Sequence, residues 1–441
     1  MKKYTNRSSK TTTELSGWLC PPEMIPIIKM KGATSLPVIR FPYCVSTHKE
    51  AAMDRPTEMT ASRIVGLDLS KKTLVGCILS KEEGFQKTRF IDGKMNPKGR
   101  EDLLKDLRDD DWVFMEGGAS SFTLARYLLN NTGMRVFVLN PMQLHIIYQS
   151  MCKTDKQDAA KIAKYARDAN PGNWCLIPIP TEQESAERSL INLHIGFSQE
   201  RNKQINKLHA VFNGQGFPDL KKSDLKNPDA RRRWIDQLLS DEAAMYSATL
   251  LADQIDFYEI QMESIHDRIR SILLSHPVEA RAWLSVPGVG DITAATAIAY
   301  IGDGSRFGTA AQLRNYIGLL PRRDQSGTVG KKLGVSKFGC MPMRRHIMQG
   351  AWGIKKSQID CSLTRYWQEP QARSKKGQKA SVAIANKMVS IAFALLRNHE
   401  TYGMPDQERY FRKKLSYYKL EALNDNPTSS KSAVTESSTQ K

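Results

Sequence analysis

Two short apolar runs in the sequence end on a carboxylate, where an alternating strand would carry a core residue. The first run begins at Ile64 and ends on Asp68, and the second extends from Trp112 to Glu116. Runs of this length are typical of buried strands. Two glycines follow Glu116 and would let another backbone or a phosphate approach closely. The pattern predicts a sheet whose strand ends carry functional side chains.

The neighbouring segments predict the other elements of an α/β domain over residues 62–180. Residues 73–80 are expected to pair with the first strand as a hairpin, and a third strand is expected near 86–91. Three strands followed by alternating helices and strands indicate a mixed sheet. The remaining expected elements are a helix over 96–108, the strand 112–116, a helix over 121–130, a strand over 135–139, and helices over 141–150 and 155–169.

Asp155 and Asp158 are three residues apart, which places both side chains on one face of a helix. Like charges at this spacing repel, so a cation or a basic residue must offset them. Mg²⁺ prefers oxygen ligands, and two such ions about 4 Å apart can serve phosphodiester chemistry. Together with Asp68 and Glu116, the pair has the ligand layout of an RNase H-like nuclease domain holding two Mg²⁺. The alternative is that Asp155 caps its helix and the other acids are solvated.

Residues 181–278 are predicted to form a helical coiled-coil arm. The segment is charged and carries apolar residues in alternating steps of four and three, which is a heptad seam. A stretch with Gly and Pro at 213–229 would form the turn of a helical hairpin. The seam consists of Leu251, Ile255, Tyr258, Met262, Ile265 and Ile269.

Residues 279–400 are predicted to form a second unit, mostly helical, that provides the main nucleic-acid surface. Positions 305–380 hold sixteen Lys and Arg against three Asp and Glu, a surplus of thirteen within a chain of net charge +19. Such a concentration favours a polyanionic partner, although some of these charges will be solvated. The candidate contacts are Arg322, Arg323, Lys331, Lys332, Lys337, Arg344 and Arg345.

A glycine turn and a serine are two further features of this unit. Gly288 and Gly290 precede a helix of small residues, where free backbone N–H groups could hold a phosphate. An ordinary turn between helices is an equal alternative. Ser326 lies beside Gly327 in a predicted loop crowded with cations, and a Ser-Gly pair in a loop is usually only a turn.

The rest of the composition limits the class of protein. Residues 1–61 are expected to be a poorly ordered N-terminal extension, and residues 401–441 a C-terminal segment that is disordered from about 424. Seven scattered cysteines without a C-x-x-C pair argue against a disulfide framework and fit a reducing cytosol. No apolar run reaches the ~18 residues of a membrane span, and no signal peptide is evident. We therefore expect a cytoplasmic protein without a membrane partner.

Several motifs together resemble those of the DEDD-type insertion-sequence transposases, the serine-dependent recombinases guided by a bridge RNA. The resemblance extends from about residue 63 to 397, some three quarters of the chain. The more specific motifs are Lys153-Thr-Asp155-Lys-Gln-Asp158-Ala and Gly318-Leu-Leu-Pro321 followed by Ser326-Gly327. The less specific ones are Gly66-Leu-Asp68, Glu116-Gly, Asn140-Pro141 and Pro287-Gly-Val-Gly290.

The resemblance implies a RuvC-like metal site formed by the four carboxylates. It also implies that Ser326 attacks the scissile phosphate and becomes covalently linked to DNA, so that the second unit is also catalytic. The implied partners are donor DNA, target DNA and a non-coding guide RNA. The family forms dimers that assemble into tetramers, in which the serine of one subunit meets the carboxylates of another. A location in the bacterial cytoplasm, associated with the nucleoid, follows from these partners.

The chain departs from the family pattern at several positions. Glu116 is followed by Gly-Gly-Ala where the family often has Ala-Thr-Gly, and Cys340 stands where Asn or His is usual. Residues 1–60 and the insert at 213–233 match nothing in the pattern. Two alternatives stay open beside a transposase: a hydrolytic RuvC-like nuclease with a structural Ser326, and a non-catalytic nucleic-acid-binding protein.

Overall fold

The computed structural model describes most of the chain from residue 56 to residue 424. The described ranges are 56–118, 120–147, 154–238, 241–326, 329–335, 338–368, 377–404 and 406–424. The N-terminal extension predicted over 1–61 lies outside these ranges except for its last six residues. The tail predicted to be disordered from about 424 also lies outside them.

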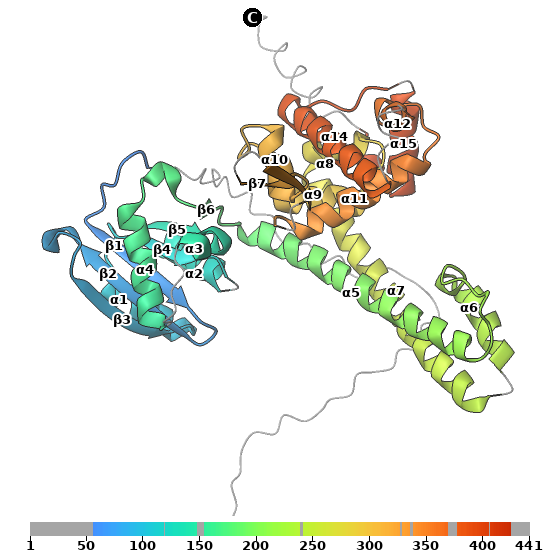
Figure 1. Cartoon of the computed structure of the whole chain (residues 1–441), viewed down its shortest axis with the longest axis horizontal. Coiled ribbons are helices and arrows are strands. Elements are labelled where there is room, and N and C mark those ends of the chain that lie inside the picture. The colour runs from blue at the N-terminus through green and yellow to red at the C-terminus, as the bar shows by residue number, and fades with distance from the viewer. Residues whose placement is uncertain are drawn as a thin grey trace, which may run out of the picture. The chain divides into compact units, whose positions relative to one another are not determined.

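A six-stranded mixed sheet forms the first part of the described chain (Figure 1). The strand order is β3-β2-β1-β4-β5-β6, in which β1 pairs antiparallel with β2 and parallel with β4. The predicted mixed sheet with helices is therefore confirmed, and it fits an RNase H-like domain. The short β6 was not predicted, because two residues carry no periodicity. The strands are β1 Arg63–Leu69, β2 Thr73–Ser80, β3 Thr88–Lys94, β4 Trp112–Glu116, β5 Arg135–Leu139 and β6 Leu176–Ile177.

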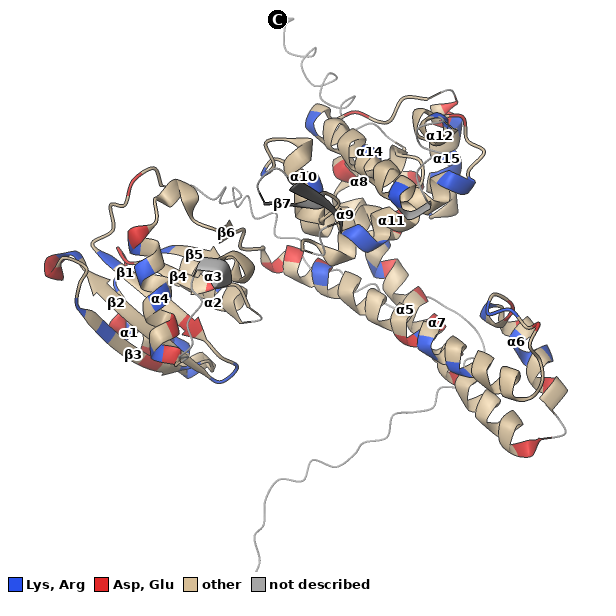
Figure 2. Cartoon of the chain, viewed as in Figure 1, with Lys and Arg blue, Asp and Glu red and all other residues tan. Residues whose placement is uncertain are grey.

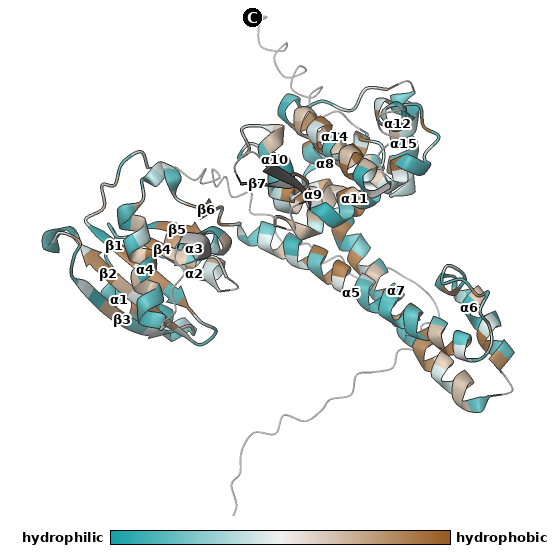
Figure 3. Cartoon of the chain, viewed as in Figure 1, coloured by the Kyte–Doolittle hydropathy of each residue, from teal (hydrophilic) through white to brown (hydrophobic). Residues whose placement is uncertain are grey.

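Helices cover both faces of this sheet, and each face has its own core. One core contains Val65 and Leu67 of β1 with residues of α1 and α2. The other contains Ile64 of β1 with residues of α3 and α4, and it includes the buried Trp174. Strands β1, β4 and β5 accordingly contribute apolar residues to both cores. Brown, hydrophobic segments are visible in the sheet (Figure 3). The helices are α1 Pro97–Asp106, α2 Ser121–Asn131, α3 Pro141–Ile147 and α4 Asp155–Asp168.

The predicted arm is a pair of long helices that pack along each other, α5 (Glu182–Gly214) and α7 (Glu242–Ser275). Ile255, Ile265 and Ile269 of the predicted seam are buried. The insert between the two helices is not a simple turn, because it contains α6 (Pro228–Ile235). Its Arg231 is 1% exposed and forms ion pairs with carboxylates of α7.

The C-terminal unit is helical around one large core, with a two-stranded hairpin that the sequence analysis did not predict. Its last helix, α15, contributes Phe411 and Leu415 to that core. Residues 379–398 of α14 are long and apolar enough to cross a membrane, but over half of the most apolar stretch is buried inside the protein, as in a core helix. The elements are α8 Pro277–Ser285, α9 Asp291–Ile301, α10 Ala310–Ile317, β7 Pro321–Ser326, β8 Val329–Val335, α11 Met341–Lys356, α12 Ser362–Gln368, α14 Gly377–Asn398 and α15 Gln407–Tyr417.

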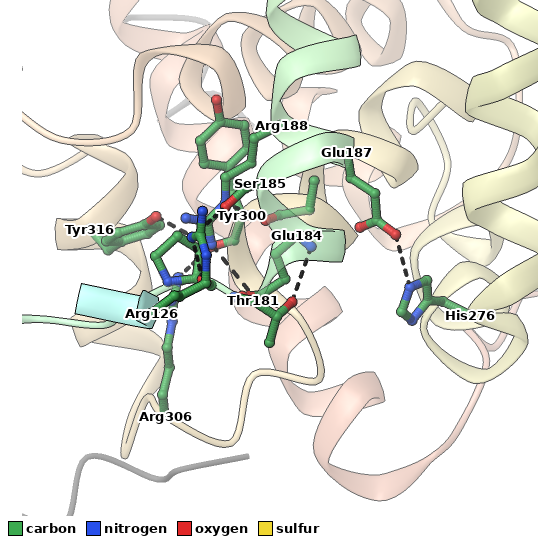
Figure 4. A network of polar contacts seen from close by, with 12 residues as sticks. Arg126, Thr181, Glu184, Ser185, Glu187, Arg188, His276, Tyr300, Arg306 and Tyr316 are labelled. Atoms are coloured by element: carbon green, nitrogen blue, oxygen red, sulfur yellow. Dashed lines mark hydrogen bonds and ion pairs between the residues drawn. The ribbon is translucent and has the colours of Figure 1, made fainter. Parts of the chain in front are cut away.

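A network of polar contacts surrounds the first turns of α5 (Figure 4). Thr181 and Glu184 form a capping box that starts the helix. Arg126 of α2 donates to the Ser185 hydroxyl at 3.0 Å, and Arg188 donates to the carbonyl oxygen of Ala299 at 2.7 Å. The start of the arm is thus hydrogen-bonded to α2 and to α9.

Candidate functional site

Asp68 and Glu116 stand next to each other at the carboxyl ends of two parallel strands. β1 and β4 pair with Leu67 beside Met115, so the next residue on each strand is one of the two acids. Because side chains alternate along a strand, Glu116 shares the face of Phe114, which packs in the core that contains α4. By the same alternation Asp68 points to that face, so both carboxylates lie on the side of the sheet that α4 covers.

Gly66 allows α4 to approach β1 closely enough to bring its acids to these strand ends. A Cβ on Gly66 would lie 2.5 Å from the carbonyl oxygen of Ala159 and 2.5 Å from the backbone nitrogen of Ala163. Any larger residue would therefore push the helix away from the sheet. Asp155 and Asp158 occupy the first turn of this helix.

Thr154 caps α4, so the interpretation of Asp155 as a helix cap is wrong. The Thr154 hydroxyl accepts a hydrogen bond from the backbone N–H of Gln157 at 3.3 Å. Asp155 is the first residue of the helix, and its side chain is exposed. An exposed carboxylate at this position can serve a ligand.

The four carboxylates are close enough to affect one another electrostatically. Burial raises the pKa of Asp68, and the charges of Asp158, Asp155 and Glu116 raise it further, in that order. A hydrogen bond from the backbone N–H of Leu69 acts in the opposite direction. A divalent cation would relieve this repulsion, since oxygen donors are what Mg²⁺ prefers. The chemistry of the donor set therefore fits a metal site.

The acids do not yet surround a common point. Within the described residues, no three His, Cys, Asp or Glu side chains are arranged so that they could hold one ion. Lys161 instead pairs with Asp158, with 2.6 Å between its Nζ and the Oδ1 of the carboxylate. Carboxylate rotamers adjust when an ion binds, whereas the pairing of β1 with β4 and the close contact at Gly66 fix the backbone positions of the acids.

Ser326 is the last residue of β7, so its assignment to a loop is wrong. The hairpin pairs Ser326 with Val329 and Arg323 with Lys332. The serine is therefore at the end of β7 that pairs with the first residue of β8. The predicted contacts Arg322, Arg323, Lys331 and Lys332 all lie on the strands of this hairpin, and Lys337 falls outside the described residues.

The remaining predicted basic contacts lie on α11. Arg344 donates to the carbonyl oxygen of Ile317 at 3.0 Å and so helps to hold α10. Arg345 lines a cavity of about 190 Å³ together with His194 and His346. Both arginines are half-buried, so neither is a freely solvated charge.

The glycine turn is closely packed by residues that the sequence analysis missed. Gly288 has φ +83°, and a Cβ there would lie 2.7 Å from the carbonyl oxygen of Gly350. The Gly288 N–H is hydrogen-bonded to the Tyr410 hydroxyl of α15, and a Cβ on Gly290 would lie 2.8 Å from the Tyr418 hydroxyl. The packing explains both glycines without a ligand, and their role as a phosphate site stays a prediction.

A buried lysine of α15 completes this packing. Lys414 donates to the carbonyl oxygens of Leu284 and Val286 at 2.6 and 3.2 Å. Its burial lowers the pKa of the ammonium group to about 7, and Asp291 counteracts that shift. The sequence does not reveal that Tyr410 and Lys414 pack against the glycine turn, because the turn lies some 120 residues earlier in the chain and only the fold brings α15 to it.

Two family profiles match the chain. A profile described as "Transposase", of the DEDD type of IS110 elements, matches residues 65–217. A second, described as "Transposase IS116/IS110/IS902 family", matches residues 280–367. The first match contains all four carboxylates, and the second contains Ser326, the glycine turn and all of the predicted basic contacts.

Individual relatives agree with these profiles. The pilin gene-inverting protein of Moraxella lacunata is 22% identical over 353 residues, which are 77% of this chain and 97% of that protein. The transposase for insertion sequence element IS1111A of Coxiella burnetii is 26% identical over 274 residues, 58% of this chain and 70% of that protein. A 43.6 kDa protein of insertion element IS110 from Streptomyces coelicolor is 26% identical over 338 residues, 65% of this chain and 80% of that protein. With the two profiles and the strand-end acids, these relatives show that the chain belongs to the DEDD-type IS110 family of DNA transposases and recombinases.

Proposed function

We propose that this transposase cleaves and rejoins DNA strands through a covalent phosphoserine on Ser326. The observation that carries the proposal is the cluster of four carboxylates at the ends of β1 and β4 and on the first turn of α4. Acids that raise the pKa of a neighbour in this way are unfavourable for the fold alone, which points to a functional role. The cationic hairpin that carries Ser326 supports the choice of nucleophile.

The proposed chemistry uses the Ser326 hydroxyl as the nucleophile and the four carboxylates as the metal site. The Oγ of Ser326 forms a bond to the scissile phosphorus while the bond from phosphorus to one bridging oxygen breaks. The serine proton passes to solvent, and the departing strand oxygen takes up a proton. Rejoining is the reverse attack by a strand hydroxyl on the phosphoserine, so the phosphodiester energy is retained without ATP.

Asp68, Glu116, Asp155 and Asp158 would hold Mg²⁺, two ions per site, and the ions would supply positive charge to the phosphate oxygens. The chain's own contribution is placement: Gly66 sets the distance of α4 from β1, and Lys161 orients the Asp158 carboxylate through their ion pair. The basic hairpin would neutralise the phosphates of the strand at Ser326.

The proposed partners are donor and target DNA with a non-coding guide RNA. The surplus of thirteen positive charges within positions 305–380 supports polyanionic partners on this unit. Lys and Arg (blue in Figure 2) are present on α11, α14 and α15 of this unit. Partners of this kind agree with a nucleoid-associated protein of the bacterial cytoplasm.

We further propose a homodimer that assembles into a tetramer, with α7 as a self-association surface. Tyr246, Leu250, Phe257 and Ile260 are 66%, 46%, 54% and 67% exposed, although all four side chains are large and apolar. Their spacings of four, seven and three residues give a second heptad stripe beside the buried seam. A second copy of the chain would cover such a stripe.

A suicide oligonucleotide, nicked at the junction, tests the nucleophile. We expect a covalent protein–DNA adduct that Ser326→Ala abolishes and that Ser305→Ala, an exposed serine of the same unit, leaves unchanged. Free nicked product from Ser326→Ala would instead support the second candidate, a hydrolytic nuclease in which the same carboxylates activate water. Mg²⁺-dependent cleavage that is lost in Asp68→Ala and in Asp155→Ala would exclude a non-catalytic binding protein.

A further inference from the structure

Aromatic rings and lysines pair with one another on three helices of the C-terminal unit, α11, α12 and α14. The Nζ of Lys355 lies 5.2 Å from the ring centroid of Trp352 and 4.9 Å from that of Trp367. The Nζ of Lys387 lies 4.0 Å from the ring centroid of Tyr366. These three helices contact one another in the fold. We name these residues, together with the exposed Lys356 that follows Lys355 in α11, the Trp–Lys face: Trp352, Lys355, Lys356, Tyr366, Trp367 and Lys387.

Part of this face is exposed although its rings are large. Trp352 is 40% exposed, and Tyr366 and Trp367 are partly buried against the core. A lysine over each aromatic ring keeps the ring from being a purely apolar patch. Trp352 therefore offers a rigid, accessible π-surface with the ammonium group of Lys355 beside it.

The charge of the face is positive and uncompensated in the described part of the chain. No carboxylate described in the structure pairs with Lys355, Lys356 or Lys387. The nearby Asp360 is already engaged with Arg365, at 2.7 and 3.1 Å between their atoms. A ligand that complements the Trp–Lys face is therefore a polyanion that also presents flat rings.

We propose that the Trp–Lys face binds unpaired nucleotides of single-stranded DNA. Every base has a π-face that can stack on an aromatic side chain, and each neighbouring phosphate can be neutralised by a lysine. Bases inside a duplex are already stacked on each other, so a duplex has no free face to offer Trp352. The choice of DNA rests on the proposed function, because cleaved strands must leave one duplex before they join another.

Binding of a labelled twelve-nucleotide oligo(dT) to the full-length chain, carrying Ser326→Ala so that no chemistry intervenes, tests the proposal. We expect Trp352→Ala to weaken oligo(dT) binding about 5- to 100-fold and to leave binding of a duplex unchanged. Trp352→Phe should retain most of the affinity, because it keeps a ring. Tyr417→Ala is the matched control, since Tyr417 is 79% exposed but lies outside the face.

Two further measurements keep the test independent of folding and of catalysis. Photocrosslinking with 5-iododeoxyuridine should attach the oligonucleotide to Trp352 or to a neighbouring ring of the face. Lys356→Gln and Lys387→Gln should each lower the salt dependence of binding by about 0.7 in log–log slope. Because binding needs no cleavage, the result is separate from the adduct test of Ser326.

Three results would overturn the proposal. Equal oligo(dT) affinity for wild type and Trp352→Ala would show that the tryptophan does not stack on bases. Cross-links that all map outside the face would place the single strand elsewhere. An oligo(U) of the same length that binds more tightly than oligo(dT), and loses that affinity in Trp352→Ala, would make the ligand RNA.

Discussion

Gly66→Ala tests whether close packing of α4 on β1 positions the candidate metal site. An ideal Cβ on Gly66 would lie 2.5 Å from two backbone atoms of α4, whereas ordinary contacts begin at 3.4 Å. The helix must therefore move by about 1 Å, and overpacking of this kind costs about 1–3 kcal/mol. For a domain of this size that corresponds to a fall in Tm of roughly 3–12 °C.

The same displacement would carry Asp155 and Asp158 away from the strand ends. A misplacement of about 1 Å at a catalytic group can cost on the order of 100-fold in rate. We expect Gly66→Ala to bind Mn²⁺ more weakly in calorimetry and to cleave DNA at least about tenfold more slowly.

Gly196→Ala is the matched control, because a Cβ at Gly196 in α5 meets nothing within 4 Å. That change should raise stability by up to about 1 kcal/mol, since alanine is the better helix residue. If Gly66→Ala kept the wild-type Tm and the wild-type Mn²⁺ affinity, the close approach of α4 would not be what assembles the acids.

Three more predictions concern charged groups. Asp111→Asn should lower the free energy of unfolding in urea by about 3 kcal/mol, because it leaves the Arg63 charge buried without its partner. Arg63 and Asp111 pair at 3.0 Å, and their side chains are 7% and 0% exposed. A loss below about 1 kcal/mol would contradict this prediction. The hydrogen bond that His276 donates to the Glu187 carboxylate raises the pKa of His276, so below pH 6.5 the free energy of unfolding of wild type should exceed that of His276→Gln by about 0.5–1 kcal/mol. The difference should fade as the pH rises through the raised pKa, and a pH-independent difference would refute the pair. Burial and the neighbouring acids raise the pKa of Asp68, so Asp68→Asn should stabilise the metal-free chain at pH 7 but not below the ordinary Asp pKa of about 3.8. Mg²⁺ should no longer raise the Tm of this variant.

The sheet and its acids could be predicted because their signals are local. The strands Trp112–Glu116 and Arg135–Leu139 were predicted to the residue, since each is a short apolar run between polar breaks. Asp68 and Glu116 interrupt that pattern at the strand ends, which is visible without a structure. How closely α4 approaches Gly66 is not visible, because it depends on a contact about 95 residues away in sequence.

The hairpin of Ser326 could not be predicted for a different reason. β7 reads Pro-Arg-Arg-Asp-Gln-Ser and β8 contains two adjacent lysines, so neither strand shows apolar alternation. Its strands are defined by their mutual hydrogen bonds, which composition does not reveal. The packing of Tyr410 and Lys414 against the glycine turn depends in the same way on tertiary contacts.

The arrangement of Lys161 explains how the acid cluster can exist before a metal binds. The carboxylates of β1, β4 and α4 are held together by packing, and their repulsion is a cost that the apolar contacts of α4 must outweigh. Lys161 supplies one positive charge to Asp158, but the two side chains are 22% and 36% exposed. Pairs with that exposure contribute only about 0–1 kcal/mol, which a divalent ion bound by several carboxylates easily exceeds. The Lys161 ammonium group therefore reduces the repulsion among the carboxylates without blocking the site. The close contact at Gly66 keeps the four acids together, so a divalent cation can relieve the repulsion that remains.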